Sequence, residues 1–123
     1  MQDLVGIIRE ESELEQALVR IEELRQRAGR VRVEGNRHFN PGWHLALDLY
    51  SMLSVSEAVT LSALARKESR GGHTRSDYPG TDAHLGSVNL VARRRGGETV
   101  LDEEPLPEMP AELKDLFEDK GGH

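Results

Sequence analysis

The sequence predicts an all-α fold of packed helices, followed by a C-terminal extension that contains a small β-hairpin. Two long stretches carry apolar residues at helical spacing, and a shorter apolar stretch opens the chain. Aromatic residues make up only 4% of the 123 residues, which favours helices packed through aliphatic side chains over a β-sandwich. We expect a helical domain over residues 1–86 and the extension over residues 87–123.

The opening segment, residues 1–9, has the length of about two helical turns and is interrupted by Gly6. Its apolar residues leave little polar face, so we expect another part of the protein to cover it. Such an apolar start fits a domain that begins inside a larger chain.

The next segment predicts an amphipathic helix that begins near Glu13 and ends near Gly29. Ser12 and Glu15 have the spacing of a capping box, in which a hydroxyl and a carboxylate satisfy free backbone donors at a helix start. The apolar residues recur at spacings of three and four, while the charged residues fall mainly on the other faces. These apolar residues are Leu14, Leu18, Ile21, Leu24 and Ala28.

A loop over residues 30–39 and a second, longer helix are predicted next. Asn40 and Pro41 supply an N-cap and a first-turn proline. From Trp43 to Ser69 the chain has neither Pro nor Gly, which predicts a central rod of roughly 40 Å. Its broad apolar surface indicates contact on more than one side.

The chain after Gly71-Gly72 predicts a turn-rich loop that reaches Gly86. Two short runs of strand-forming residues, 88–94 and 98–102, are separated by Gly96-Gly97 and predict a hairpin. The end of the chain predicts a stiff connector and one short acidic helix. The connector contains Pro105, Pro107 and Pro110, and the helix covers residues 111–119.

Composition excludes several classes of function. The net charge of −6 argues against a nucleic-acid partner that binds a basic face. Because cysteine is absent, the chain has no disulfide, thiolate metal site or cysteine nucleophile. No window approaches the roughly 20 apolar residues that span a bilayer, so we expect no direct membrane insertion and a cytoplasmic location.

No sequence motif predicts a cofactor or a metal in this chain. It lacks the Gly-x-Gly-x-x-Gly fingerprint, the phosphate loop and the His-Glu-x-x-His zinc motif. His44 and Asp48 are one helical turn apart, but a metal site needs at least one further ligand. We therefore predict no cofactor-binding or metal-binding residue here.

Three residues have the types of a catalytic triad, namely Ser69, His73 and Asp77. Gly71-Gly72 breaks the helix that would align them, and no nucleophile elbow surrounds the serine. We interpret them as a capping serine, a loop histidine and a turn aspartate, so no catalytic residue is predicted.

Positive charge gathers where the long helix is predicted to end, at Arg66, Lys67, Arg70 and Arg75. Cations at this position complement the helix dipole. Alternatively, these arginines form a polar docking surface together with His73 and Asp77, because forked guanidinium groups bind carboxylates and carbonyls. The residues alone leave both interpretations open.

The run Glu68-Ser69-Arg70-Gly71-Gly72-His73-Thr74-Arg75-Ser76-Asp77-Tyr78-Pro79 resembles a known signature. It is similar to Glu-Ser-Arg-Gly-x-His-x-x-x-Asp-Tyr-Pro in the C-terminal domain of succinate dehydrogenase and fumarate reductase flavoproteins. L-Aspartate oxidases carry a similar run. The resemblance covers about residues 1–92, and residues 1–9 look like the opening helix of that family.

The resemblance implies a three-helix bundle of spectrin-repeat form. It also implies that the parent flavoprotein carries FAD on a separate domain, and that the dicarboxylate is held there and in a capping domain. The expected role of this chain is then non-catalytic docking on those two domains, with an iron-sulfur subunit as a further partner. The docking residues would be Arg70, His73, Arg75, Asp77 and Tyr78.

The resemblance further implies that the parent interconverts succinate and fumarate, and that partner subunits hold it at the inner face of the cell membrane. The long continuation after the signature favours this family over L-aspartate oxidase, which is the first alternative. An independent helical interaction protein is the second. The isolated chain is not expected to be active in either case, since the flavin and dicarboxylate motifs are missing.

Overall fold

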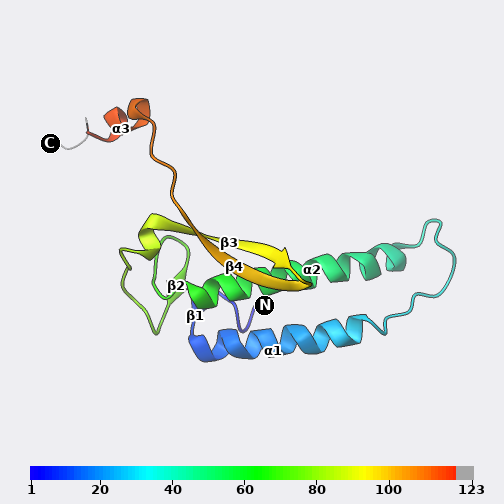
Figure 1. Cartoon of the computed structure of the whole chain (residues 1–123). Coiled ribbons are helices and arrows are strands. Elements are labelled where there is room, and N and C mark those ends of the chain that lie inside the picture. Colours follow the sequence, from blue (N-terminus) through cyan, green and yellow to red (C-terminus); the bar gives the residue numbers. More distant parts are fainter. Residues whose placement is uncertain (119–123) are drawn as a thin grey trace.

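A computed structural model of the chain describes residues 1–118. Its centre is a pair of helices, α1 (Glu11–Ala28) and α2 (Pro41–Ala65), which run side by side in opposite directions (Figure 1). The loop between them, residues 29–40, forms one end of the pair, and we call it the tip. The two long helices predicted from the sequence are confirmed, and they pack antiparallel.

Two small apolar clusters hold the helix pair together. One, near the end opposite the tip, joins Val5 to Leu14, Ala17 and Ala63. The other lies closer to the tip and comprises Ile21, Ala28 and Leu53. Because most core residues are small or aliphatic, the helices approach each other closely over a narrow core.

The start of α1 differs from the predicted capping box. The helix begins at Glu11, and the Ser12 hydroxyl donates to the Glu10 carboxylate at 3.4 Å instead of binding the helix backbone. The free backbone N–H of Glu11 donates to Asp77, which comes from the loop after α2. A capping residue that is distant in sequence therefore replaces the local one.

The start of α2 confirms its prediction, whereas its end does not. Asn40 accepts a hydrogen bond from the Gly42 N–H at 3.1 Å, with Pro41 in the first turn. The helix ends at Ala65, four residues before Ser69, because the backbone of Arg66 leaves the helical region. The carbonyls at this end accept hydrogen bonds from Arg75.

The predicted opening helix is wrong, and with it the all-α description. Residues 1–7 form turns and bends, and β1 (Ile8–Arg9) pairs in parallel with β2 (Thr74–Arg75). The described residues contain four strands beside three α-helices, so the predicted three-helix bundle is only partly supported. The backbone of this segment bonds to the distant loop, which a helix would not allow.

The predicted hairpin is confirmed and is longer than expected. Strand β3 (Val88–Arg95) follows a 3₁₀ turn, η1 (Leu85–Ser87), and pairs antiparallel with β4 (Glu98–Pro105). Gly96 and Gly97 form the turn with φ angles of 59° and 90°, as a tight hairpin requires. The Thr99 hydroxyl donates to Glu57 of α2 at 2.6 Å, which holds the hairpin along one flank of that helix.

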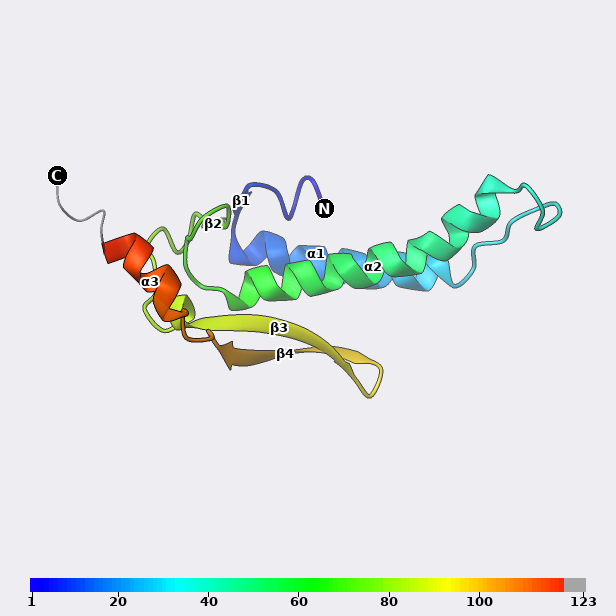
Figure 2. The ribbon, with the colours of Figure 1, turned by 90° about the horizontal axis from the view of Figure 1, so that it is seen from above.

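The C-terminal helix α3 (Ala111–Glu118) stands apart from the helix pair (Figure 2). It confirms the predicted short helix, except that Asp119 lies outside the described residues. Pro105 belongs to β4, opposite Val88, so the connector is shorter than predicted. Within residues 1–118, no helix has the length and hydrophobicity needed to cross a membrane.

Candidate functional site

The residues of the signature run lie in the loop of residues 66–85, which closes the end of the helix pair opposite the tip. We call it the signature loop. Ser69 organises its backbone: the hydroxyl donates to the Tyr78 carbonyl at 2.9 Å and accepts from the Arg75 N–H at 2.8 Å. The Ser69 N–H donates to the Gly80 carbonyl at 2.8 Å. One small side chain thus fixes both arms of the loop.

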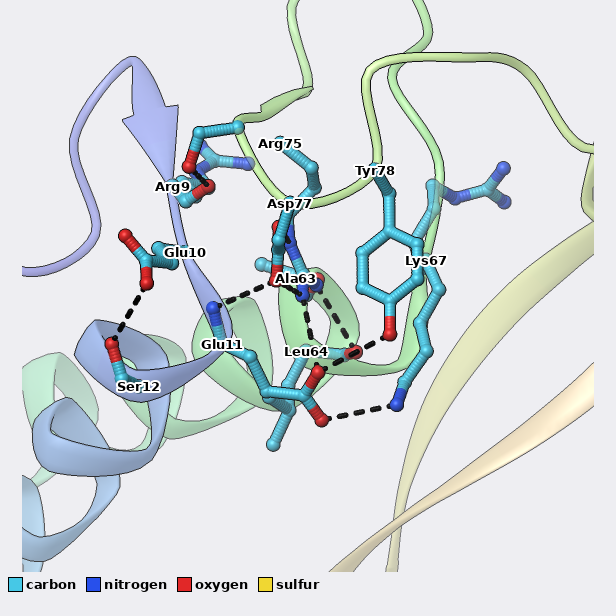
Figure 3. Close-up of polar contacts among 12 residues, drawn as sticks. Arg9, Glu10, Glu11, Ser12, Ala63, Leu64, Lys67, Arg75, Asp77 and Tyr78 are labelled. Atoms are coloured by element: carbon cyan, nitrogen blue, oxygen red, sulfur yellow. Dashed lines mark hydrogen bonds and ion pairs between the residues drawn. The ribbon is translucent and has the colours of Figure 1, made fainter.

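Arg75 is fully buried and uses its guanidinium in two directions (Figure 3). Its Nε and Nη2 atoms donate to the two carboxylate oxygens of Asp77 at 2.7 and 2.6 Å. Its Nη1 atom donates to the Ala63 carbonyl at 2.8 Å, at the last turn of α2. A cation at this position satisfies free carbonyls and complements the helix dipole.

Asp77 extends the same arrangement to the start of α1. Its Oδ2 atom accepts from the Glu11 N–H at 3.0 Å. Because the helices are antiparallel, the start of α1 lies beside the end of α2, and a single ion pair serves both helix ends. Arg75 is the main reason why the pKa of Asp77 is lowered from 3.8 to about 2.

Tyr78 supports this pair from one side. Its ring centroid is 4.9 Å from the guanidinium carbon of Arg75, a cation–π distance. Its hydroxyl donates to the Glu11 carboxylate at 3.3 Å, and the Lys67 ammonium lies 3.0 Å from the same carboxylate. The hydrogen bond from Lys67 is the largest cause of the lowered pKa of Glu11.

Glu68 is another acid of the signature loop, and it is fully buried. Its carboxylate accepts hydrogen bonds from Arg66 at 2.6 Å, from Arg70 at 3.1 Å and from the Asp82 N–H at 2.8 Å. These donors, with Arg70 first, lower its pKa from 4.5 to about 2. Arg66 also donates to the Val88 carbonyl at 3.2 Å, so Glu68 connects the loop to the start of the hairpin.

His73 has a fixed tautomer. Its Nδ1 atom lies 2.7 Å from Nη1 of Arg9, and its Nε2 atom lies 2.9 Å from the Arg66 carbonyl. Because a guanidinium can only donate, Nδ1 accepts and Nε2 carries the proton. Burial is the largest cause of the lowered pKa of His73, and the nearby arginine charges add to it. The neutral imidazole is the form that these contacts require.

These contacts do not assemble a catalytic group in the described part of the chain. Ser69, His73 and Asp77 bind other partners and not one another. Across residues 1–118, no three carboxylate or imidazole side chains converge as a metal site, and this includes the His44 region. What the arrangement does chemically is to hold a rigid polar surface at the end of two helices.

The five predicted docking residues differ in accessibility. Arg75 is enclosed, 24% of the Asp77 side chain is exposed, and 45% of the Arg70 side chain is exposed. Sequence reasoning missed Arg9 as a partner of His73 and Glu68 as the acid that holds Arg70. Glu68 begins the signature run and was open to prediction, whereas Arg9 is 64 residues from His73 and gave no local signal.

Comparisons with known proteins agree with one another. A family model described as fumarate reductase flavoprotein C-term matches residues 1–115. The fumarate reductase flavoprotein subunit of Helicobacter pylori is 41% identical over 83 residues, which cover 67% of this chain and 12% of that protein. The succinate dehydrogenase flavoprotein subunit of Coxiella burnetii is 39% identical over 83 residues, or 67% of this chain and 14% of that protein.

Solved structures show the same similarity in three dimensions. Mycobacterium smegmatis Sdh1 in complex with UQ1 matches with a TM-score of 0.83 and 52% identity, over 96% of this chain and 20% of that one. A quinol fumarate reductase of E. coli matches with a TM-score of 0.76 and 30% identity, over 85% of this chain and 19% of that one. The chain thus spans a fifth or less of the length of these relatives.

Proposed function

We infer that this chain, which belongs to the family of fumarate reductase flavoprotein C-terminal domains, is a non-catalytic helical domain that packs on the flavin-binding part of a longer protein. The full protein would be a FAD-dependent oxidoreductase that interconverts succinate and fumarate. The names of the relatives support this activity over that of an L-aspartate oxidase. Residues 1–86 would form the docking unit and residues 87–123 its extension.

One observation carries the proposal: the ionisable groups of the signature loop bind partners within the chain. A general acid or base must reach the proton that it transfers. Asp77 and Glu68 instead accept several hydrogen bonds each, and burial and arginine neighbours keep His73 in its neutral form. Residues held in this way support a shape better than they support proton transfer.

Among residues 1–118, the two long helices do not fit the pyrophosphate of FAD. The start of α1 is occupied by the Asp77 carboxylate and that of α2 by the Asn40 side chain, so neither helix offers a vacant anion site to a pyrophosphate. FAD would therefore be held by the remainder of the protein.

The proposed docking surface consists of the five predicted residues in two roles. Arg70 and His73 would contact the flavin-binding or capping domain directly, since 45% of the Arg70 side chain is exposed and His73 is partly exposed, whereas Arg75 is enclosed. Arg75, Asp77 and Tyr78 would hold the loop in the conformation that docks. An iron-sulfur subunit is a further partner proposed for the assembled protein, which would be cytoplasmic and held at the membrane by partner subunits.

The test is Arg70→Ala in the full-length flavoprotein. We expect flavin to be released at a lower temperature, while turnover per bound flavin stays within a few-fold of the original value. Loss of a true acid or base typically costs about 10²–10⁴-fold. Arg20→Ala is the matched control, because this arginine is exposed on α1 and contacts only Glu23 among the described residues.

Melting of the 123-residue chain with the same substitution separates loss of docking from loss of fold. Docking predicts that flavin release shifts by more than this melting temperature does. A thousandfold fall in turnover, with flavin content and melting unchanged, would place Arg70 in the active site and contradict the proposal.

A further inference from the structure

An uncovered apolar stripe runs along α2. Leu45, Met52 and Val59 follow one another at intervals of seven residues, which places them along one line of the helix surface. They are 68%, 63% and 41% exposed, and Val55, on the same side, is 63% exposed. Isolated exposed apolar residues are ordinary, but a continuous stripe marks an interface.

The stripe begins at the tip, beside Phe39. The ring of Phe39 is fully exposed, and its φ angle is 57°. A bulky residue with positive φ is strained, and such strain persists where surrounding contacts compensate for it. Phe39, His44 and Leu45 line one hollow of about 510 Å³, so the ring and the first residue of the stripe share a surface.

The other end of the stripe reaches the signature loop. Val59 lines a hollow of about 450 Å³ together with Arg9, Arg66 and His73. The stripe is therefore continuous with the surface proposed to dock on the flavin-binding part. One face of the molecule extends from Phe39 to His73, along the whole of α2.

Other elements of the chain cover parts of the remaining surface of α2. Helix α1 packs on one side, and the hairpin is fixed on a flank through Glu57. Figure 2 shows the hairpin along one flank and the N-terminal segment along the other, with the tip half of α2 beyond both. The sulfur of Met1 lies 4.0 Å from the Thr60 hydroxyl, so the first residue of the N-terminal segment contacts α2.

The charge of the tip indicates what meets Phe39. Residues 29–40 contain three arginines and one glutamate, in a chain whose net charge is −6. Within residues 1–118, no carboxylate lies within ion-pair distance of Arg30, Arg32 or Arg37, although arginines elsewhere pair repeatedly. A surface that meets the tip would therefore be acidic around an apolar pocket.

We propose that the flavin-bearing remainder of the full-length protein covers the stripe from Phe39 to Val59, with Phe39 inserted as an anchor into an acidic-rimmed pocket of that remainder. This proposal rests on the proposed function. The remainder is the favoured occupant because it accounts for four fifths or more of the related proteins and is covalently attached.

Cysteine labelling tests the proposal, because the chain has no cysteine of its own. Met52→Cys places a thiol on the stripe, and Leu47→Cys places one on the opposite flank of the same helix, where Leu47 is 51% exposed. Maleimide labelling is measured by mass spectrometry of the α2 peptide, in the 123-residue chain and in the full-length flavoprotein purified alone.

We expect position 52 to be labelled more than about tenfold more slowly in the full-length flavoprotein than in the 123-residue chain, while position 47 changes less than about twofold, as burial of one side of a helix requires. Equal labelling of position 52 in both would overturn the proposal. So would protection that appears only when other subunits are added, since the occupant would then be a separate partner.

Second substitutions at the tip test the anchor and the charge. Phe39→Ser and Arg37→Glu are each added to Met52→Cys in the full-length flavoprotein, and each should raise the labelling rate at position 52. If neither substitution changes that rate, the tip is not part of the interface. Failure here is separable from failure of docking. Suppose that Arg70→Ala lowers flavin retention, but position 52 is labelled as fast in the full-length flavoprotein as in the 123-residue chain. The proposed docking of the signature loop would then be supported, and the proposal for the stripe would fail.

Discussion

The two ends of the helix pair use arginine in opposite ways. At the signature loop, Arg66, Arg70 and Arg75 all bind carboxylates of the same loop. At the tip, the arginines have no carboxylate partner among the described residues, and Phe39 is fully exposed. The comparison teaches that a dense polar signature can serve the internal structure of the chain, while a less distinctive loop leaves its arginines without an ion-pair partner and exposes an aromatic ring.

Burial explains why the signature end is so specific in sequence. An ionised group that leaves water must be paired and hydrogen-bonded, or it costs several kcal/mol. Arg75 and Glu68 are both fully buried, and each needs its particular partners in place. At the exposed tip water can solvate the arginines, so the folded chain alone imposes fewer requirements there.

The largest expected effect comes from Arg75→Met. It removes the guanidinium that pairs with the Asp77 carboxylate and donates to the Ala63 carbonyl, so we expect a loss of about 3 kcal/mol in the free energy of unfolding of the 123-residue chain. Urea denaturation followed by circular dichroism measures it. Arg32→Met at the tip is the control. Equal losses in unfolding free energy at the two positions would contradict the difference between the signature loop and the tip.

An intermediate effect is expected from acid. The pKa of Asp77 is lowered in the folded chain, so its contribution to stability is complete above its ordinary pKa of 3.8 and is lost as pH falls toward 2. The difference in unfolding free energy between the original chain and Asp77→Asn should therefore shrink below pH 4. Urea denaturation at a series of pH values measures it, and a difference independent of pH would contradict the role of the ion pair.

The smallest effect is expected at the tip. Replacing Arg30, Arg32 or Arg37 by Gln should change the unfolding free energy of the 123-residue chain by less than about 0.5 kcal/mol, because exposed side chains without an ion-pair partner contribute little. Thermal or urea denaturation is sufficient. A loss above about 1 kcal/mol in the free energy of unfolding is the usual effect of a point substitution. Such a loss would show that contacts within the chain also stabilise the tip.

The parts of the fold that follow local rules could be predicted from the sequence. Helical spacing predicted the two long helices, Asn40-Pro41 predicted the start of α2, and Gly96-Gly97 predicted the hairpin turn. The opening helix was not predictable in this way, because the backbone of Ile8 and Arg9 pairs with Thr74 and Arg75. A local pattern cannot show that a distant strand competes for the same hydrogen bonds.

In the candidate site, too, the features that depend on local sequence were predictable and those that depend on tertiary contact were not. The sequence located its residue types, and the interpretation that arginines complement the end of α2 agrees with the Arg75 contacts. The sequence did not show that the cap of α1 comes from Asp77, because Ser12 and Glu15 offered a plausible local cap. Side-chain partners that depend on tertiary contact lay beyond spacing arguments.

The parallel pairing of β1 with β2 also bears on the order of folding. Together with the Asp77 cap, it joins residues that are 66 apart in the chain, so it closes a very large ring. The entropy lost on closing so long a loop is offset only when several contacts form at once. The two helices bring these segments together once they have aligned. We therefore expect the β1–β2 pairing and the Asp77 cap to form last, after the helix pair has assembled.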